Sequence, residues 1–202
     1  MDAYVFDIDG TLLESFEADC DLYVAAVRKV LGVNAVDTNW SAYRHVTDQG
    51  ILREIMQRNG IAPSADLVDA TRQEFVGLLR AHIDAHGPFR EIPGALDFVS
   101  RLAADGRHLV AYATGAWRES ALLKLESAAF PIEGLRVSTS SECVDRVSIM
   151  RGAVAGAPRD LGRIVYFGDG VWDRVAAETL GWDFVPVGAA LDGLRHFHDL
   201  AA

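Results

Sequence analysis

Two carboxylates lie two residues apart near the start of the chain. Asp7 and Asp9, followed by Gly10 and Thr11, come directly after a run of β-branched and aromatic residues. If the strand geometry continued, both acidic side chains would lie on one face, where they repel each other unless a divalent cation with oxygen ligands lies between them. The segment therefore indicates a cation site. The alternative is an exposed acidic turn, in which Asp and Gly are common residues.

A second acidic segment follows a later apolar run. Gly168 and Gly170 flank Asp169, and glycine permits the sharp turn that would present this carboxylate beyond the end of a strand. Asp169 is therefore a predicted metal ligand. Asp173 falls in the first turn of an expected helix, where we expect it to support the metal site without contacting the ion directly. An acid that only stabilises the helix N-terminus is the alternative.

Two further segments contain groups that suit phosphate. Thr114 and Gly115 end an expected strand, where a hydroxyl and free backbone N–H groups form a corner for phosphate oxygens; a helix cap at Thr114 is the alternative. Arg146 precedes an expected helix and would supply the fixed positive charge that a site rich in carboxylates and phosphate needs. A surface ion pair of Arg146 with Glu142 or Asp145 is the alternative.

The order of the secondary-structure elements predicts how these segments come together. Alternating strands and helices are typical of an α/β fold with a doubly wound parallel sheet, which places its ligands at the carboxyl ends of the strands. Helices are expected between Pro93-Gly94 and Asp105-Gly106, and over residues 147–155 and 171–180. Strands are expected at residues 3–8, 108–113, 135–139, 163–167 and 182–187.

Residues 15–88 do not share this alternation. Helical spacing covers residues 16–31, 51–58 and 65–82 without an intervening strand. Because the chain leaves the sheet after its first strand and returns near Pro88, we expect a small helical cap over the site. The predicted domains are a Rossmann-like core of residues 1–14 and 89–202 and a cap of residues 15–88, with a hinge at 14–15 and 87–88.

One polar cluster in this predicted cap could face the substrate. It contains His45, Thr47, Asp48 and Arg53. Thr47 or Asp48 could instead cap the helix that begins near Gln49, because threonine and aspartate are common helix N-caps.

Composition and charge narrow the classes of function. The 202 residues are 50% hydrophobic, which is enough to bury a core, and the net charge of -10 without a Lys/Arg run disfavours nucleic acid and anionic membranes as partners. The N-terminus lacks the basic and apolar regions of a signal peptide, and no apolar run reaches the ~20 residues of a membrane helix. We expect a cytoplasmic protein whose Cys20 and Cys143 are free thiols.

The four segments together resemble the haloacid dehalogenase-like (HAD) superfamily of phosphohydrolases. The pattern is a strand with DxDGT, a strand with Thr-Gly, a basic residue before a helix, and a strand with GDxxxD, over residues 1–14 and 89–187. The insertion resembles the type 1 cap of phosphoglycolate phosphatase relatives. The resemblance implies that Asp7 is a nucleophile that forms an aspartyl phosphate, and that Asp9 is the general acid and base.

The resemblance also implies how phosphate and metal are bound. Thr114 and the N–H of Gly115 would hold the phosphoryl oxygens, with Gly10 and Thr11 near the same group. Magnesium would bind Asp7, Asp169 and the backbone carbonyl of Asp9. Arg146 occupies the position at which the family usually has lysine. Its guanidinium is a planar group with several N–H donors, whereas the lysine ammonium is a compact point charge.

The expected function is hydrolysis of a small phosphorylated metabolite with Mg²⁺ as cofactor. A dehalogenase is disfavoured because that branch lacks the second aspartate, which protonates a leaving alcohol. Two alternatives stay open: a phosphomutase similar to β-phosphoglucomutase, in which a cap shields the aspartyl phosphate for reuse, and a HAD domain that binds a ligand without catalysis.

Overall fold

A parallel sheet forms the centre of the protein. In the computed structural model, which describes residues 1–157, 161–198 and 200, the strand order is β3-β2-β1-β4-β5. The chain runs outward from the central β1 to β2 and β3, and then returns to the other side of β1 with β4 and β5. The predicted α/β class with a doubly wound parallel sheet is confirmed. The strands are β1 (Ala3–Phe6), β2 (Leu109–Ala113), β3 (Arg136–Ser138), β4 (Ile164–Gly168) and β5 (Asp183–Pro186).

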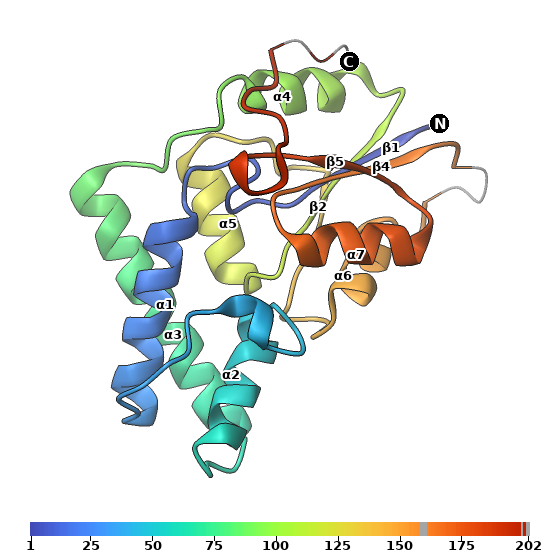
Figure 1. The fold of residues 1–202 in the computed structure, drawn as a ribbon. Helices are drawn as coiled ribbons and strands as arrows, with labels where there is room; N and C mark the ends of the chain where they lie inside the picture. Colours follow the sequence, from blue (N-terminus) through green and yellow to red (C-terminus); the bar gives the residue numbers. More distant parts are fainter. Residues whose placement is uncertain (158–160, 199, 201–202) are drawn as a thin grey trace.

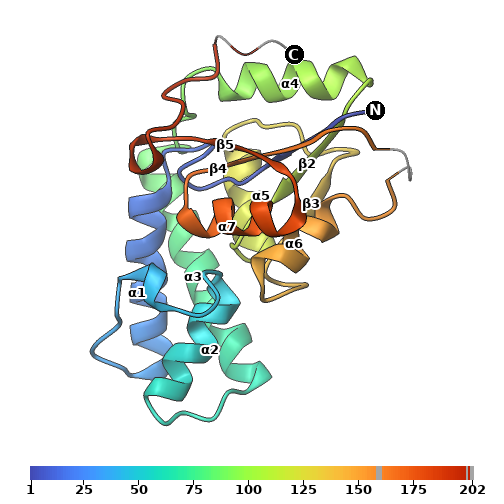
Figure 2. The ribbon, with the colours of Figure 1, turned by 45° about the vertical axis from the view of Figure 1, so that its right-hand side comes forward.

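Helices cover both faces of this sheet. α4 (Ala95–Asp105) and α5 (Arg118–Ser127) pack on the face that carries Phe6, Tyr112 and Phe167. α6 (Arg146–Ala153) and α7 (Val171–Leu180) pack on the opposite face, and Figure 2 shows them on the other side of the sheet from α4. Because successive strand residues point to opposite faces, strands covered on both sides must be apolar throughout.

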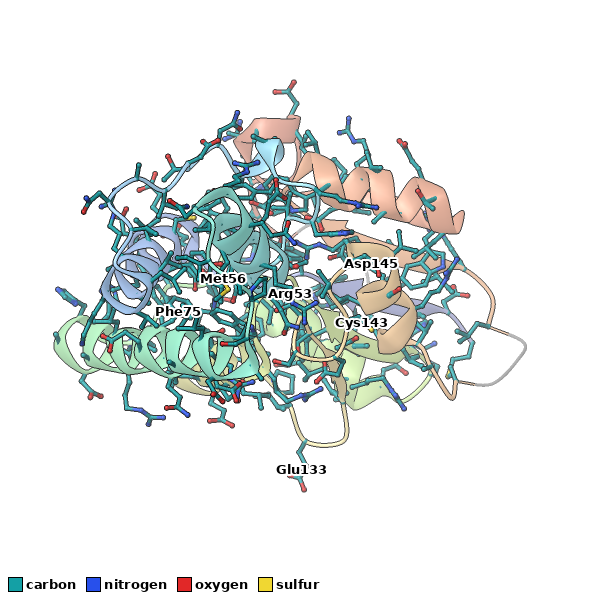
Figure 3. The ribbon with its side chains drawn as sticks, turned by 90° about the horizontal axis from the view of Figure 1, so that it is seen from below. Arg53, Met56, Phe75, Glu133, Cys143 and Asp145 are labelled. Atoms are coloured by element: carbon teal, nitrogen blue, oxygen red, sulfur yellow. The ribbon has the colours of Figure 1, made fainter. Side chains whose placement is uncertain are left out.

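A small helical cap follows the first strand. Its helices α1 (Phe16–Leu31), α2 (Asp48–Arg58) and α3 (Ala65–His86), with the short 3₁₀ helix η1 (Trp40–Ala42), lie beyond the carboxyl ends of the strands (Figure 1). They enclose an apolar cluster of their own, in which Met56 and Phe75 point between the helices (Figure 3). The inserted cap is confirmed. The domain boundaries at 14–15 and 88–89 stay a prediction, and residues 201 and 202 lie outside the described residues.

Trp117 joins the cap to the core. It directly precedes α5 but is fully buried in the apolar cluster of the cap, with ring centroids 5.7 Å from Tyr23 and 6.0 Å from Phe75. Aromatic pairs at these separations attract each other beyond their burial of area. The core therefore contributes a large side chain to the packing of the cap.

The observed elements differ from the predicted ones mainly at their ends. β1 ends at Phe6, two residues before the predicted end, although the N–H of Asp7 still donates to the Phe167 carbonyl at 2.9 Å. α2 begins at Asp48 rather than residue 51, because the Thr47 hydroxyl accepts a hydrogen bond from the N–H of Gly50 and caps the helix. α6 begins and ends one to two residues early. In the described part of the chain, none of the helices has the length and apolarity needed to cross a bilayer.

Candidate active site

The ends of the parallel strands bring the predicted residues into one pocket. Asp7 follows β1 by one residue, Thr114 follows β2, and Asp169 follows β4, and these strands pair in register. Parallel strands end at the same edge of a sheet, so residues far apart in sequence meet there. Six predicted site residues line the same pocket: Asp7, Asp9, Thr114, Gly115, Arg146 and Asp169.

Three carboxylates form a group that fits a metal ion. Asp7, Asp169 and Asp173 each offer an oxygen, and the three oxygens lie within 4.8 Å of one another. Burial and the charge of Asp173 raise the pKa of Asp7 well above its usual range and that of Asp169 to about 7. A divalent cation would relieve this crowding, and carboxylate oxygens are ligands that Mg²⁺ accepts. The donor set therefore fits magnesium. For Asp9, the atom predicted to bind the ion is the backbone carbonyl oxygen and not a carboxylate oxygen.

Asp173 is already held by protein groups. Its Oδ2 accepts a hydrogen bond from the N–H of Gly170 at 3.1 Å, and its Oδ1 accepts one from the Tyr166 hydroxyl at 3.2 Å. Arg146 Nε lies 3.4 Å from the same Oδ1. The indirect role of Asp173 at the metal site stays a prediction.

Gly10 and Thr11 lie beside the pocket and not on its wall. A Cβ atom at residue 10 would lie 2.2 Å from Asp169 Oδ2, so glycine is needed for the first motif to approach the second acidic segment. Thr11 is fully buried, and its hydroxyl has no hydrogen-bond partner among the described residues. Their contact with phosphate stays a prediction.

Arg146 lies inside the site rather than at the surface. Its Nη1 lies 3.2 Å from Asp7 Oδ1, and its Nη2 donates to the Val46 carbonyl in the cap at 3.1 Å. The alternative partners are engaged elsewhere, because Glu142 pairs with Arg118 and Asp145 caps α6. The guanidinium is thus placed to meet a phosphate bound next to Asp7.

Thr114 and Gly115 form a buried corner of the pocket between core and cap. Thr114 does not cap α5, since Trp117 occupies the N-cap position, and its Oγ1 accepts from the N–H of Ala116 at 3.2 Å. A Cβ atom on Gly115 would lie 2.7 Å from Arg146 Nη2, so glycine leaves room for the guanidinium. The Gly115 carbonyl accepts from the N–H of Asp48 at 2.8 Å, and the cap loop is thereby docked on this corner.

The comparison with known families agrees with this geometry. A family model described as haloacid dehalogenase-like hydrolase matches residues 1–181. The chain belongs to the haloacid dehalogenase-like hydrolases. No curated protein matches it.

Solved structures of other proteins share the fold of this HAD-like hydrolase. CbbY from Rhodobacter sphaeroides in complex with phosphate is 20% identical, with a TM-score of 0.69 over 99% of this chain and 90% of that one. β-Phosphoglucomutase from Clostridium difficile is 14% identical, with a TM-score of 0.70 over 95% and 86%. A predicted phosphoglycolate phosphatase from Haemophilus somnus is 18% identical, with a TM-score of 0.58 over 92% and 84%.

The HAD-like hydrolase also holds a buried lysine that the sequence patterns did not identify. Lys124 Nζ donates to both carboxylate oxygens of Asp9 at 2.6 Å and to Asp19 Oδ1 of α1 at 2.5 Å. The Ser15 hydroxyl donates to Asp9 Oδ1 at 2.5 Å. The available signal was the position of Lys124 on the buried side of α5, where it lies with Ser120, Ala121 and Leu125.

The cap wall of the pocket is aromatic and acidic. Asp19 and Asp48 lie on it with Phe16, Tyr23, Trp40 and Ile51. Burial and the charge of Asp9 raise the pKa of Asp19 to about 6, against the opposing effect of Lys124. Thr47 and Asp48 of the predicted polar cluster reach this pocket. His45 and Arg53 do not: both line a separate hollow, and Arg53 lies at the edge of α2 nearest Cys143 (Figure 3).

Proposed function

We propose that this HAD-like hydrolase is a magnesium-dependent phosphatase that hydrolyses a small phosphate monoester through an aspartyl phosphate on Asp7. One observation carries the proposal: the Asp7 carboxylate lies on the pocket wall, 3.2 Å from the Arg146 guanidinium, and one of its oxygens lies within 4.8 Å of oxygens of Asp169 and Asp173. A carboxylate nucleophile there would have both the guanidinium and a bound cation as nearby positive charges. We further propose that the protein acts in the cytoplasm.

Each of these side chains has a separate role in the proposed reaction. An Asp7 oxygen would attack phosphorus while Asp9 protonates the leaving alcohol; Asp9 would then take a proton from the water that hydrolyses the aspartyl phosphate. Arg146, the Thr114 hydroxyl and the N–H of Gly115 would orient the phosphoryl oxygens. Magnesium held by Asp7, Asp169 and the carbonyl of Asp9 would supply positive charge that offsets the charge of the phosphate.

A phosphomutase is the second candidate, because the cap is seated on the phosphate corner. The N–H of Asp48 donates to the Gly115 carbonyl, and the Thr47 hydroxyl donates to the Val144 carbonyl at 2.8 Å. Such docking would shield an aspartyl phosphate from water. A mutase must also bind a second phosphate, however, and Arg146 is the only Arg or Lys among the described residues on this pocket wall. The phosphatase is therefore preferred.

The test is release of inorganic phosphate from a panel of phosphate monoesters, with and without magnesium. We expect turnover of at least one ester that requires magnesium and that falls by at least about 10³-fold in Asp7→Asn. Asp97→Asn is the matched control, because this aspartate lies on α4 with its side chain 73% exposed and pairs only with nearby Arg101 among the described residues.

The other outcomes decide between the candidates. Turnover that must be primed by a sugar bisphosphate would identify a phosphomutase. A wild-type protein that is inert towards the whole panel with magnesium, and inert with bisphosphate, would contradict both enzymatic proposals and favour a domain that binds a ligand without catalysis. Equal activity of Asp7→Asn and wild type would place the nucleophile elsewhere.

A further inference from the structure

Lys124 is a buried charge without a role in the reaction described above. Its side chain is 0% exposed, although burying an ammonium group is costly unless it is paired. Its partners come from two parts of the protein: Asp9 belongs to the catalytic motif after β1, and Asp19 belongs to α1 of the cap. The lysine thus bridges the proposed general acid and the cap.

The contacts of Asp9 show what this bridge controls. Among the described residues, Lys124 and Ser15 are the groups that bind its carboxylate, and Lys124 alone contacts both oxygens. Asp9 lies on the pocket wall with its side chain 14% exposed, so it is held from the protein side and open towards the ligand. An ammonium group that contacts both oxygens opposes rotation of the carboxylate away from it.

We propose that Lys124 is a positioning residue that orients Asp9 towards the leaving group and couples this orientation to the cap through Asp19. The inference rests on the proposed phosphatase function. Without the ammonium group, the carboxylates of Asp9 and Asp19 would face each other uncompensated and move apart. A displacement of about 1 Å at a proton donor is enough to reduce the rate strongly.

The leaving group decides whether Asp9 is needed as a proton donor in the first half of the reaction. Ethyl phosphate, an ester, releases an alkoxide, whereas acetyl phosphate, an acyl phosphate, releases acetate. As an Asp7 oxygen bonds to phosphorus, the bond from phosphorus to the leaving oxygen breaks and its electron pair stays on that oxygen. An alkoxide then takes a proton from Asp9, whereas acetate leaves acetyl phosphate as a stable anion without a proton. Since kcat/KM covers steps up to departure of the leaving group, comparing the two substrates separates proton donation from the later hydrolysis.

The experiment compares kcat/KM for ethyl phosphate and acetyl phosphate in Lys124→Met. We expect a loss of about 10²-fold for ethyl phosphate, as for loss of a general acid, and less than about threefold for acetyl phosphate. Asp9→Asn should show the same pattern, and the double variant should be no worse than Asp9→Asn alone, since both residues act in one step. Lys29→Met is the control: its side chain is 68% exposed, it pairs with Glu74, and it should behave as wild type.

Asp19→Asn provides a second variant if Lys124→Met does not fold. It keeps the contact between Lys124 and Asp9 and removes only the charge on the cap side, so we expect a smaller loss that is again confined to ethyl phosphate. Equal losses for both substrates, or no loss for either, in the folded variants would overturn the inference. A wild-type protein inactive on both substrates and on the wider panel would instead contradict the proposed function.

Discussion

The two walls of the pocket have opposite characters. The core wall carries the ends of three strands and presents the groups that suit phosphate and metal: Asp7, Thr114, Gly115, Arg146 and Asp169. The cap wall presents Asp19 and Asp48 among aromatic side chains, and no Arg or Lys among the described cap residues lies on it. Under the proposed function, we therefore expect the phosphate to bind at the core wall and a neutral or positively charged leaving group to lie against the cap wall.

These walls are joined by few but specific contacts. Arg146 donates to the Val46 carbonyl, Asp48 binds the core through its backbone N–H, and its Oδ2 accepts from the N–H of Trp117 at 2.8 Å. The same loop of the cap thus contacts the phosphate corner and its supporting arginine. Changes on each wall should therefore have different consequences.

The largest effect is expected for Arg146 on the core wall. Arg146→Ala should lower kcat/KM by about 10³-fold, because it removes the guanidinium beside Asp7 and Asp173. Arg146→Lys should be intermediate, because a lysine keeps the charge but cannot contact Asp7, Asp173 and the cap carbonyl at once. The measurement is steady-state kinetics on the best ester. Arg151→Ala, on the exposed side of the same helix, is the control. If Arg146→Ala stayed within threefold of wild type, the phosphate site would lie elsewhere.

Trp117 should contribute more than any single hydrogen bond to the packing of the cap against the core. Trp117→Ala should destabilise the protein by about 3 kcal/mol, since it removes a fully buried indole that packs on Tyr23 and Phe75. Urea unfolding measures the loss, and limited proteolysis should cut the cap helices first. Trp182→Ala is the control, because Trp182 packs only partly buried on the far face of the sheet. Unchanged protease resistance of the cap would show that the cap packs independently of the core.

The contrast between the walls also marks what could be predicted from the sequence. The strand ends follow from local patterns, because apolar runs and glycines locate Asp7, Thr114 and Asp169, and parallel strands must end at one edge. The capping role of Thr47 was equally local. Lys124 and Asp19 were missed because their contact joins α5 to α1, and a lysine on a helix is ordinarily read as solvent-exposed. The burial of Trp117 in the cap could not be predicted either, because its partners Tyr23 and Phe75 depend on tertiary structure.

Substitution of Asp48 should test the negative charge of the cap wall through a change in substrate specificity. Asp48→Asn keeps an acceptor for the N–H of Trp117 but removes a negative charge from the cap wall. We expect kcat/KM for a carboxylate-bearing ester such as 2-phosphoglycolate to rise roughly tenfold relative to ethyl phosphate, since a repulsion of about 1–2 kcal/mol is lost. Burial raises the pKa of Asp48 well above its usual range, so the carboxyl is protonated at lower pH and the effect should grow as pH rises. Glu17→Gln, on an exposed position of α1, is the control. An unchanged ratio of the two esters would contradict selection by charge on this wall.

The smallest effect is expected for Thr47, which is compared with Ser64. Both residues are helix N-caps, but only Thr47 also contacts the core. Thr47 caps α2 and also donates to the Val144 carbonyl of the core, whereas Ser64 caps α3 by accepting from the N–H of Leu67. Alanine at either position should cost about 1 kcal/mol of stability. Only Thr47→Ala should also raise KM, by roughly threefold, because it removes about 1 kcal/mol of docking between the cap loop and the core. Thr47→Ser retains both hydrogen bonds and should restore the wild-type KM. Equal KM values in the two alanine variants would mean that the loop is held by its other contacts, those of Val46 with Arg146 and of Asp48 with Gly115 and Trp117.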